Sequence, residues 1–106
     1  MTDRSSRPVG QKVLYIDDEA LLKMAFVETL KQQGYQARGA VSGREALDMI
    51  EAETPDIIIL DMMMKPMDGW ETLTHIKDME QSHDVPVIMQ TGKSLTIKDV
   101  IRYGDQ

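Results

Sequence analysis

The chain contains no cysteine, no long apolar run and no excess of basic residues. Without cysteine it can form neither a disulfide bond nor a thiolate-ligated zinc site, so we expect a protein of the reducing cytoplasm. No stretch approaches the roughly 20 apolar residues of a membrane-spanning helix, and we expect no membrane partner. The formal net charge is −6, which argues against direct binding to nucleic acid, because phosphate backbones attract basic surfaces.

The composition is that of one folded domain. Apolar residues make up 42% and charged residues 28% of the 106 residues, a balance typical of a chain with a single core. Residues 1–10, MTDRSSRPVG, are polar, contain proline and glycine and show no periodicity, so we expect a flexible tail. Residues 11–106 are predicted to form the domain itself.

Strand and helix patterns alternate along this domain. The predicted strands are residues 12–16, 35–40, 57–60 and 85–90, and the predicted helices are residues 19–33, 42–53, 70–81 and 96–104. The strand IIIL, residues 57–60, is apolar on both faces. Such strands, separated by helices, indicate a parallel sheet covered on both sides. The predicted fold class is therefore α/β, with a doubly wound parallel sheet.

Several residues predict where the helices begin, end and face the core. Gly34 is expected to end the first helix, and the capping-box motif SGRE, Ser42–Glu45, to begin the second. The first helix is predicted to turn an apolar stripe of Leu22, Phe26 and Leu30 to the core. The third helix is predicted to have one apolar side, formed by Trp70, Leu73, Ile76 and Met79.

Acidic residues follow two of the predicted strands at the point where each strand ends. Asp17, Asp18 and Glu19 come directly after VLYI, and Asp61 follows IIIL. At about 5 Å and an effective dielectric near 20, each like-charge pair costs roughly 3 kcal/mol. The first cluster could be an acidic first helical turn, which the helix macrodipole favours. That interpretation does not explain Asp61, because the next helix is expected only near Asp68.

A shared cation explains both acidic positions. The carboxyl ends of parallel strands meet at one edge of an α/β sheet, where ligands bind. If the first and third strands are neighbours, Asp17, Asp18 and Asp61 converge there, and Thr91 follows the fourth strand at an equivalent position. A hard divalent ion such as Mg²⁺ takes oxygen ligands at about 2.1 Å and would relieve the repulsion. The residues themselves therefore favour an oxygen-ligated cation site.

Three motifs in this order, VLYIDDE, IIILDMMMKPMDG and VPVIMQTGK, resemble the response regulator receiver domain of two-component signalling, the CheY-like family. The resemblance covers about residues 12–104. It implies a flavodoxin-like sheet with strand order 2-1-3-4-5 and Mg²⁺ as the cofactor. It also implies a switch that accepts a phosphoryl group from a sensor histidine kinase or phosphotransfer protein, and not a turnover enzyme.

The resemblance assigns roles to the acidic residues. Asp61 would be the phosphoacceptor, attacking the phosphohistidine of the kinase. Asp18 would ligate Mg²⁺ directly and Asp17 largely through water. Asp61 and the backbone carbonyl of Met63 would complete the protein ligands.

Three residues after the fourth strand also match the family pattern. Thr91 would be the switch hydroxyl that bonds the new phosphoryl group, and Gly92 would leave room for that group. Lys93 occupies a position that tunes the phosphoryl lifetime in the family. Thr91 would read out the phosphorylation of Asp61, and Gly92 and Lys93 would lie beside the phosphoryl group.

The chain departs from the family pattern in two places. Lys65 stands at the usual proline position and Pro66 follows it, while the Asp61-to-Gly69 spacing is kept, so we expect a local shift of the loop with function retained. The sequence as given stops at Gln106, where the family's fifth strand and its lysine would begin. The residues given are therefore predicted to form a C-terminally incomplete receiver domain, and we expect a fifth strand and helix to exist beyond them. A chain that lacked these elements would expose the fourth strand, which could then form a homodimer.

Other functions fit the residues less well. A phosphohydrolase of the haloacid-dehalogenase type needs a second acid two residues after the nucleophile, and here that residue is Met63. A phosphorylation-independent interaction module stays an alternative, because the family's lysine is missing. The methionines of MMMKPM could ligate Cu(I), but without cysteine a packing role is favoured.

Overall fold

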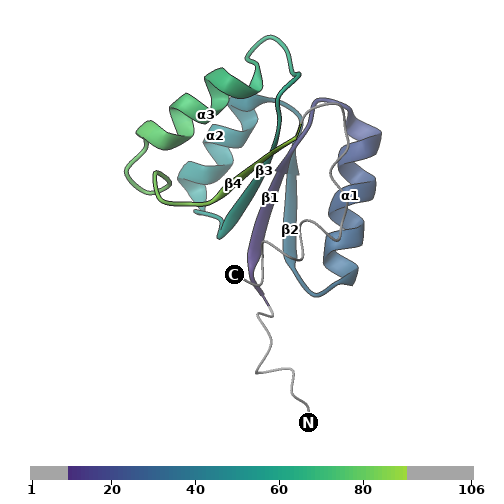
Figure 1. Ribbon diagram of the computed structural model, residues 1–106. Helices are drawn as coiled ribbons and strands as arrows, with labels where there is room; N and C mark the ends of the chain where they lie inside the picture. Colours follow the sequence, from purple (N-terminus) through teal and green to yellow (C-terminus); the bar gives the residue numbers. More distant parts are fainter. Residues whose placement is uncertain (1–9, 91–106) are drawn as a thin grey trace.

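A computed structural model describes residues 10–90, in which strands and helices alternate (Figure 1). The elements are β1 (Lys12–Ile16), α1 (Ala20–Gln32), β2 (Gln36–Ala40), α2 (Gly43–Ala52), β3 (Ile57–Asp61), α3 (Gly69–Asp78) and β4 (Val87–Gln90). The predicted tail, except Gly10, and the predicted helix at 96–104 lie outside the described residues. Within residues 10–90, no helix is long and apolar enough to cross a membrane.

The four strands form one parallel sheet in the order β2-β1-β3-β4. Helix α1 covers one face of the sheet, and α2 and α3 cover the other (Figure 1). The predicted doubly wound, flavodoxin-like fold is therefore confirmed. In this order β1 and β3 are the central pair, which places the two acidic positions side by side.

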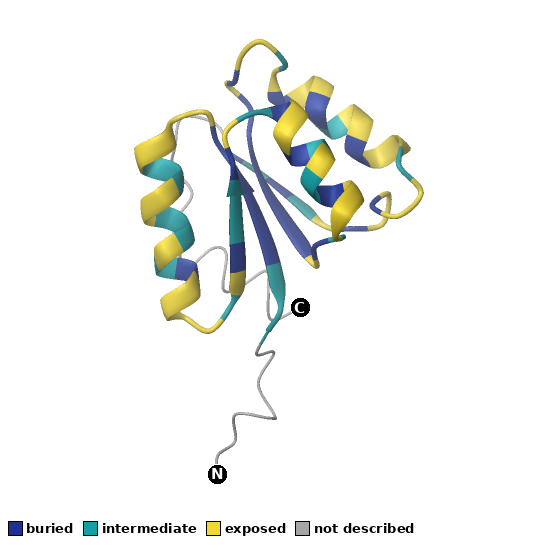
Figure 2. Ribbon diagram, turned by 180° about the vertical axis from the view of Figure 1, so that it is seen from behind, coloured by how far each residue is buried: buried dark blue, intermediate teal, exposed yellow. Residues whose placement is uncertain are grey.

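Alternation along the strands divides the core into two clusters, one on each face of the sheet. Leu14, Ile16, Ile58 and Leu60 face α2 and α3, where Ala46, Ile50 and Ile76 meet them. Val13, Tyr15, Ile57 and Ile59 face α1, where Leu30 meets them. Every residue of β3 is buried, and Figure 2 shows that the two central strands are mostly buried. Each large apolar side chain buried in this way contributes about 1.5–3 kcal/mol.

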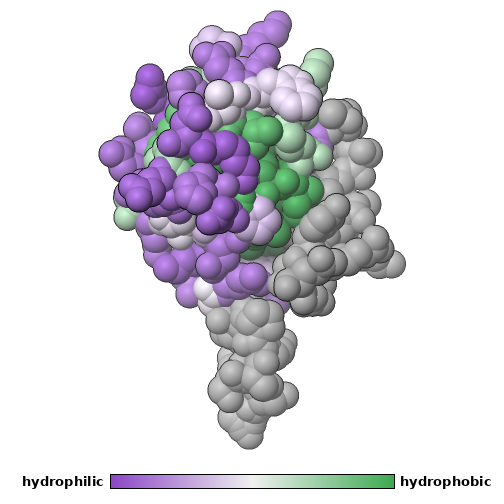
Figure 3. All heavy atoms as spheres, turned by 60° about the vertical axis from the view of Figure 1, so that its left-hand side comes forward, coloured by the Kyte–Doolittle hydropathy of each residue, from purple (hydrophilic) through white to green (hydrophobic). Residues whose placement is uncertain are grey.

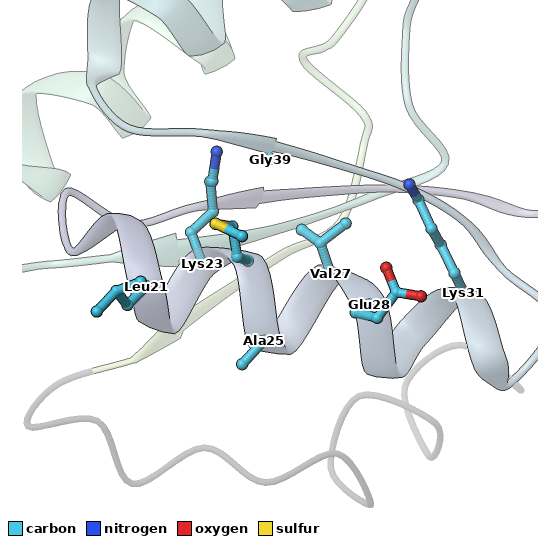
Figure 4. Close-up of a pocket in the computed structure, with 8 residues that line it drawn as sticks. Leu21, Lys23, Ala25, Val27, Glu28, Lys31 and Gly39 are labelled. Atoms are coloured by element: carbon cyan, nitrogen blue, oxygen red, sulfur yellow. The ribbon is translucent and has the colours of Figure 1, made fainter.

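Helix α1 turns two of the three residues of the predicted stripe toward the sheet, and Leu22 is half-buried. Leu30 is fully buried, and Phe26 packs against the same cluster. Gly34 ends the helix as predicted: its φ of 100° is left-handed, and the N–H of Tyr35 reaches back to the carbonyl of Leu30 at 3.1 Å. Leu21 is 81% exposed and lines a pocket that residues of α1 form together with Gly39 of β2 (Figure 4).

The bounds of α3 differ from the predicted residues 70–81 by one residue at the start and by three at the end. The carboxylate of Asp68 accepts from the N–H of Glu71 at 2.9 Å, so the helix begins at Gly69. Leu73, Ile76 and Met79 pack against the core as predicted, whereas Trp70, in the first turn of the helix, is 63% exposed. The helix stops at Asp78, three residues before the predicted end.

Polar contacts after α3 explain its early end. The hydroxyl of Ser82 donates to the carbonyl of Ile76 at 2.7 Å, and Lys77 donates to the carbonyls of His83 and Val85. These bonds favour a turn in place of another helical turn. Lys77 thus holds the α3–β4 connection against the end of α3. Figure 3 shows the molecule from the side of α2 and α3, where the surface is mostly hydrophilic and borders a continuous apolar area.

Side-chain hydrogen bonds form the predicted capping box at the start of α2. The hydroxyl of Ser42 accepts from the N–H of Glu45 at 3.0 Å, and Glu45 accepts from the N–H of Val41 at 2.9 Å. Ser42→Ala should therefore lower the free energy of unfolding by about 1 kcal/mol, measured by urea denaturation. Thr74→Ala is the control, because its hydroxyl bonds only a carbonyl within α3. Equal losses in both variants would contradict the capping argument.

Candidate functional site

Three aspartates converge at the carboxyl ends of β1 and β3. The sheet pairs Ile16 with Leu60, so the residues that follow each strand lie next to one another. One carboxylate oxygen each from Asp17, Asp18 and Asp61 lies within 4.8 Å of the other two. Asp17 and Asp61 are buried, whereas Asp18 is exposed. The predicted convergence is therefore present, with one carboxylate facing solvent.

Two donors hold the carboxylate of Asp17. Its Oδ1 accepts from the N–H of Glu19 and its Oδ2 from the hydroxyl of Tyr15, each at 3.0 Å. The alternative of an acidic first helical turn is wrong, because α1 begins at Ala20 and its first turn contains no acidic residue. Asp17 is thus oriented by the strand and the turn around it, not by the helix macrodipole.

The carboxylate of Asp61 is held by the loop that follows it. Asp61 is the last residue of β3, and its Oδ1 accepts from the N–H of Met63 at 3.0 Å. Strand pairing continues one residue beyond it, because the N–H of Met62 donates to the carbonyl of Gln90 at 3.1 Å. The side chain is therefore fixed both by the sheet and by the start of the loop.

The loop closes on Gly69, at the start of α3. The N–H of Gly69 donates to the carbonyl of Met62 at 3.1 Å. A Cβ at this position would lie 2.5 Å from the Cα of Met62 and 2.7 Å from the carbonyl oxygen of Asp61, both backbone atoms. This contact explains why the Asp61-to-Gly69 spacing matters. The loop keeps that contact even though its proline follows Lys65, in a cis peptide bond.

The methionines of the loop divide between the core and the surface. Met64 belongs to the core cluster and Met62 is buried, whereas Met63 is 73% exposed. Met63 lies in a pocket that it shares with Trp70. This division supports the packing role for Met62 and Met64 over thioether ligation of Cu(I).

Sequence reasoning missed two residues of the site, Tyr15 and Gln90. Both are buried, and the side-chain Nε2 of Gln90 donates to the hydroxyl of Tyr15 at 3.1 Å. A tyrosine in an otherwise apolar buried strand could have signalled them, since a buried phenol needs a hydrogen-bond partner. Thr91, Gly92 and Lys93, which the sequence placed beside Asp61, lie outside the described residues.

A parallel sheet of order 2-1-3-4 with aspartates after its two central strands defines a receiver-like class of α/β proteins. A sequence profile described as the response regulator receiver domain matches residues 13–105. The chain belongs to this family, the receiver domains of two-component systems.

Solved structures of receiver domains resemble the chain over most of its length. The N-terminal domain of a response regulator receiver protein from Methanoculleus marisnigri JR1 is 43% identical, with a TM-score of 0.74, and the match covers 88% of this chain and 76% of that one. The chemotaxis response regulator CheY4 of Vibrio cholerae is 30% identical, with a TM-score of 0.76, covering 87% and 77%. A signal receiver domain of a histidine kinase from Syntrophus aciditrophicus is 29% identical, with a TM-score of 0.72, covering 91% and 72%.

Receiver domains bind Mg²⁺ in an acidic pocket, and the donor atoms of this chain fit that ion. All three converging side chains offer carboxylate oxygens, the ligands that a hard cation prefers. Two ligand oxygens at about 2.1 Å from one ion lie at most about 4.2 Å apart, close to the separation within this cluster. The ligand chemistry therefore agrees with Mg²⁺, and the oxygens, which lie within 4.8 Å of one another, would approach slightly to share one ion.

The close approach at Gly69 predicts a large effect of a small substitution. Gly69→Ala should lower the free energy of unfolding by about 2 kcal/mol, because the added methyl meets backbone that cannot rotate away. Urea denaturation measures this loss. Gly39→Ala is the control, since the two nearest atoms there belong to the long side chain of Lys23, which can move away, and it should cost less. A Gly69→Ala protein as stable as the parent would refute the steric argument.

Proposed function

We propose that this domain is a phosphorylation switch in which Asp61 accepts a phosphoryl group, with Mg²⁺, from the phosphohistidine of a sensor histidine kinase or phosphotransfer protein. The observation that supports this most is the position of Asp61. It is buried at the end of β3, in reach of the carboxylates of Asp17 and Asp18. Structural burial alone gives no reason to gather three anions there.

The two aspartates after β1 take different parts. Asp18 is the exposed member of the cluster, and we assign it direct contact with Mg²⁺. Both oxygens of Asp17 already accept hydrogen bonds from the protein, which suits contact with the ion through water. The backbone carbonyl of Met63 is assigned as a further ligand beside Asp61. When bound, Mg²⁺ neutralises charge on the phosphoryl oxygens and orients them.

The transfer itself needs a positioned carboxylate and little else from the protein. A lone pair of an Asp61 oxygen forms the new O–P bond while the P–N bond to the partner's imidazole breaks, and the imidazole keeps that electron pair. The N–H of Met63 holds the carboxylate during this step. Thr91 follows the last residue of β4, and we assign its hydroxyl to the phosphoryl group as the readout. The domain is modified in this reaction and does not turn over substrate.

A phosphohydrolase mechanism has less support. It would need a carboxylic acid two residues after Asp61, where Met63 contributes an exposed thioether side chain instead. The phosphorylation-independent interaction module is the outcome to expect if Asp61 fails to react. The following two experiments separate these functions.

Phosphorylation of Asp61 can be tested with a small phosphodonor. Incubation with acetyl phosphate and Mg²⁺ should add the mass of one phosphate, and Asp61→Asn should abolish the addition, because an amide oxygen is a poor nucleophile. Intact-mass spectrometry measures both. Asp48→Asn, on the exposed side of α2, is the matched control and should react normally. Phosphorylation of Asp61→Asn at the normal rate would refute the assignment.

The metal assignment predicts an order among variants. Asp18→Ala should weaken Mg²⁺ binding at least about tenfold, and Asp17→Ala should weaken it less if its contact with the ion runs through water. Trp70, the single tryptophan, shares a pocket with Met63 and can report Mg²⁺ binding by fluorescence. Asp48→Ala controls for the lost charge. Unchanged affinity in Asp18→Ala would overturn the assignment.

A further inference from the structure

A buried chain of hydrogen bonds joins the end of β4 to the acidic cluster. The Nε2 of Gln90 lies 3.1 Å from the hydroxyl oxygen of Tyr15, which lies 3.0 Å from Oδ2 of Asp17. All three residues are buried. Gln90 is the last residue of β4, and Tyr15 and Asp17 belong to β1 and the turn after it. The chain therefore connects two strands that are not neighbours, since β3 lies between them.

The tyrosine ring is long and rigid enough to make this connection. Tyr15 pairs with Ile59 on the central strand, and its ring points to the α1 face of the sheet. There it stacks on Phe26, with ring centroids 4.4 Å apart and an angle of 3° between the ring planes. Packing against Phe26 restricts the ring, so the hydroxyl is held in one place. A ring held in this way passes a displacement at its hydroxyl on to Asp17 better than a flexible side chain would.

The chemistry of the groups fixes the direction of the chain. A carboxylate can only accept, so the single hydroxyl hydrogen of Tyr15 points to Asp17. The hydroxyl oxygen can then only accept from Gln90, which must offer its NH₂ group. Each group therefore has one orientation that satisfies its neighbour. Turning the amide of Gln90 over would set its carbonyl oxygen against the phenol oxygen.

We propose that Tyr15 and Gln90 are positioning residues that orient Asp17 for Mg²⁺ and couple the metal site to the end of β4. The proposal rests on the function proposed above. Movement of the end of β4 displaces the amide of Gln90, and through Tyr15 it changes the orientation of Asp17. Because coupling between two sites is reciprocal, binding of Mg²⁺ also stabilises one position of the end of β4. The residue that follows Gln90 in the chain is Thr91.

A double-mutant cycle on Mg²⁺ affinity tests the coupling. Tyr15→Phe keeps the ring and removes the hydroxyl, and Gln90→Met keeps the length of the side chain and removes the donor. Tyr15→Phe should weaken Mg²⁺ binding about tenfold, the lower end for groups that support a metal ligand. Gln90→Met should weaken it by less, and the double variant should match Tyr15→Phe alone. Titration calorimetry with MgCl₂ measures all four proteins.

A second readout follows the coupling in the other direction. Mg²⁺ should slow amide hydrogen exchange in β4 of the parent protein and should lose most of this effect in Tyr15→Phe. Tyr35→Phe is the matched control, because Tyr35 packs against the same core cluster but lies at the amino end of β2, away from the aspartates. It should bind Mg²⁺ like the parent. A role in packing alone would change the melting temperature without changing either readout.

The possible outcomes separate the coupling from the proposed function. Parent-like affinity in Tyr15→Phe, or independent effects of the two substitutions, would overturn the coupling while leaving the proposed function intact. If the parent protein binds no Mg²⁺ and Asp61 takes no phosphate, both are overturned. If Tyr15→Phe does not fold, Gln90→Met alone decides, because it leaves the stacked ring in place, and parent-like Mg²⁺ affinity in it would overturn the proposal.

Discussion

Electrostatic repulsion among three carboxylates is the constraint on which the rest of this structure depends. The cluster brings oxygens of Asp17, Asp18 and Asp61 within 4.8 Å of one another, where each pair costs roughly 3 kcal/mol at an effective dielectric near 20. The pairing and apolar packing of the sheet offset this repulsion, because they keep β1 and β3 side by side. Every residue of β3 is buried, and β3 pairs with both neighbours up to its carboxyl end. The aspartates are thus held together by apolar packing on both faces of the sheet below them.

Hydrogen-bond donors near the strand ends orient the carboxylates of Asp17 and Asp61. Asp17 accepts from a backbone N–H and a phenol, and Asp61 accepts from the N–H of Met63. The backbone donors, the N–H groups of Glu19 and Met63, belong to the turns that follow β1 and β3. Each aspartate is therefore oriented by the turn that begins beside it. The close contact of Gly69 with Met62 keeps the second of these turns tight. An ion that binds here meets carboxylates that are already arranged, and little ordering is left to be done on binding.

The sequence predicts the fold and the meeting of the aspartates because both follow from short-range patterns. Strands that are apolar on both faces indicate a parallel sheet, and the family resemblance supplies the strand order that places the ends of β1 and β3 together. The exposure of Trp70 was not predicted, although Leu73, Ile76 and Met79 of the same predicted side do pack against the core. Trp70 lies in the first turn of α3, and the periodicity that places the other three residues does not show whether the core extends to that end of the helix. The link from Gln90 to Asp17 was also missed, because it joins strands separated by a third. Thr91, Gly92 and Lys93 lie outside the described residues, so their predicted roles stay predictions.

A sheet buried on both faces transmits motion poorly through its middle, because close packing resists small displacements. Change is easier at the strand ends, where Asp17, Asp61 and Gln90 all lie. Asp61 and Gln90 are paired across β3 and β4, so phosphorylation of Asp61 would act directly beside the end of β4. Through its hydrogen bond with Gln90, Tyr15 connects the end of β4 to β1, on the other side of β3. Its ring is supported by Phe26 and the core below, while its hydroxyl reaches the groups that carry charge. One side chain thereby joins the rigid part of the domain to the part that can respond.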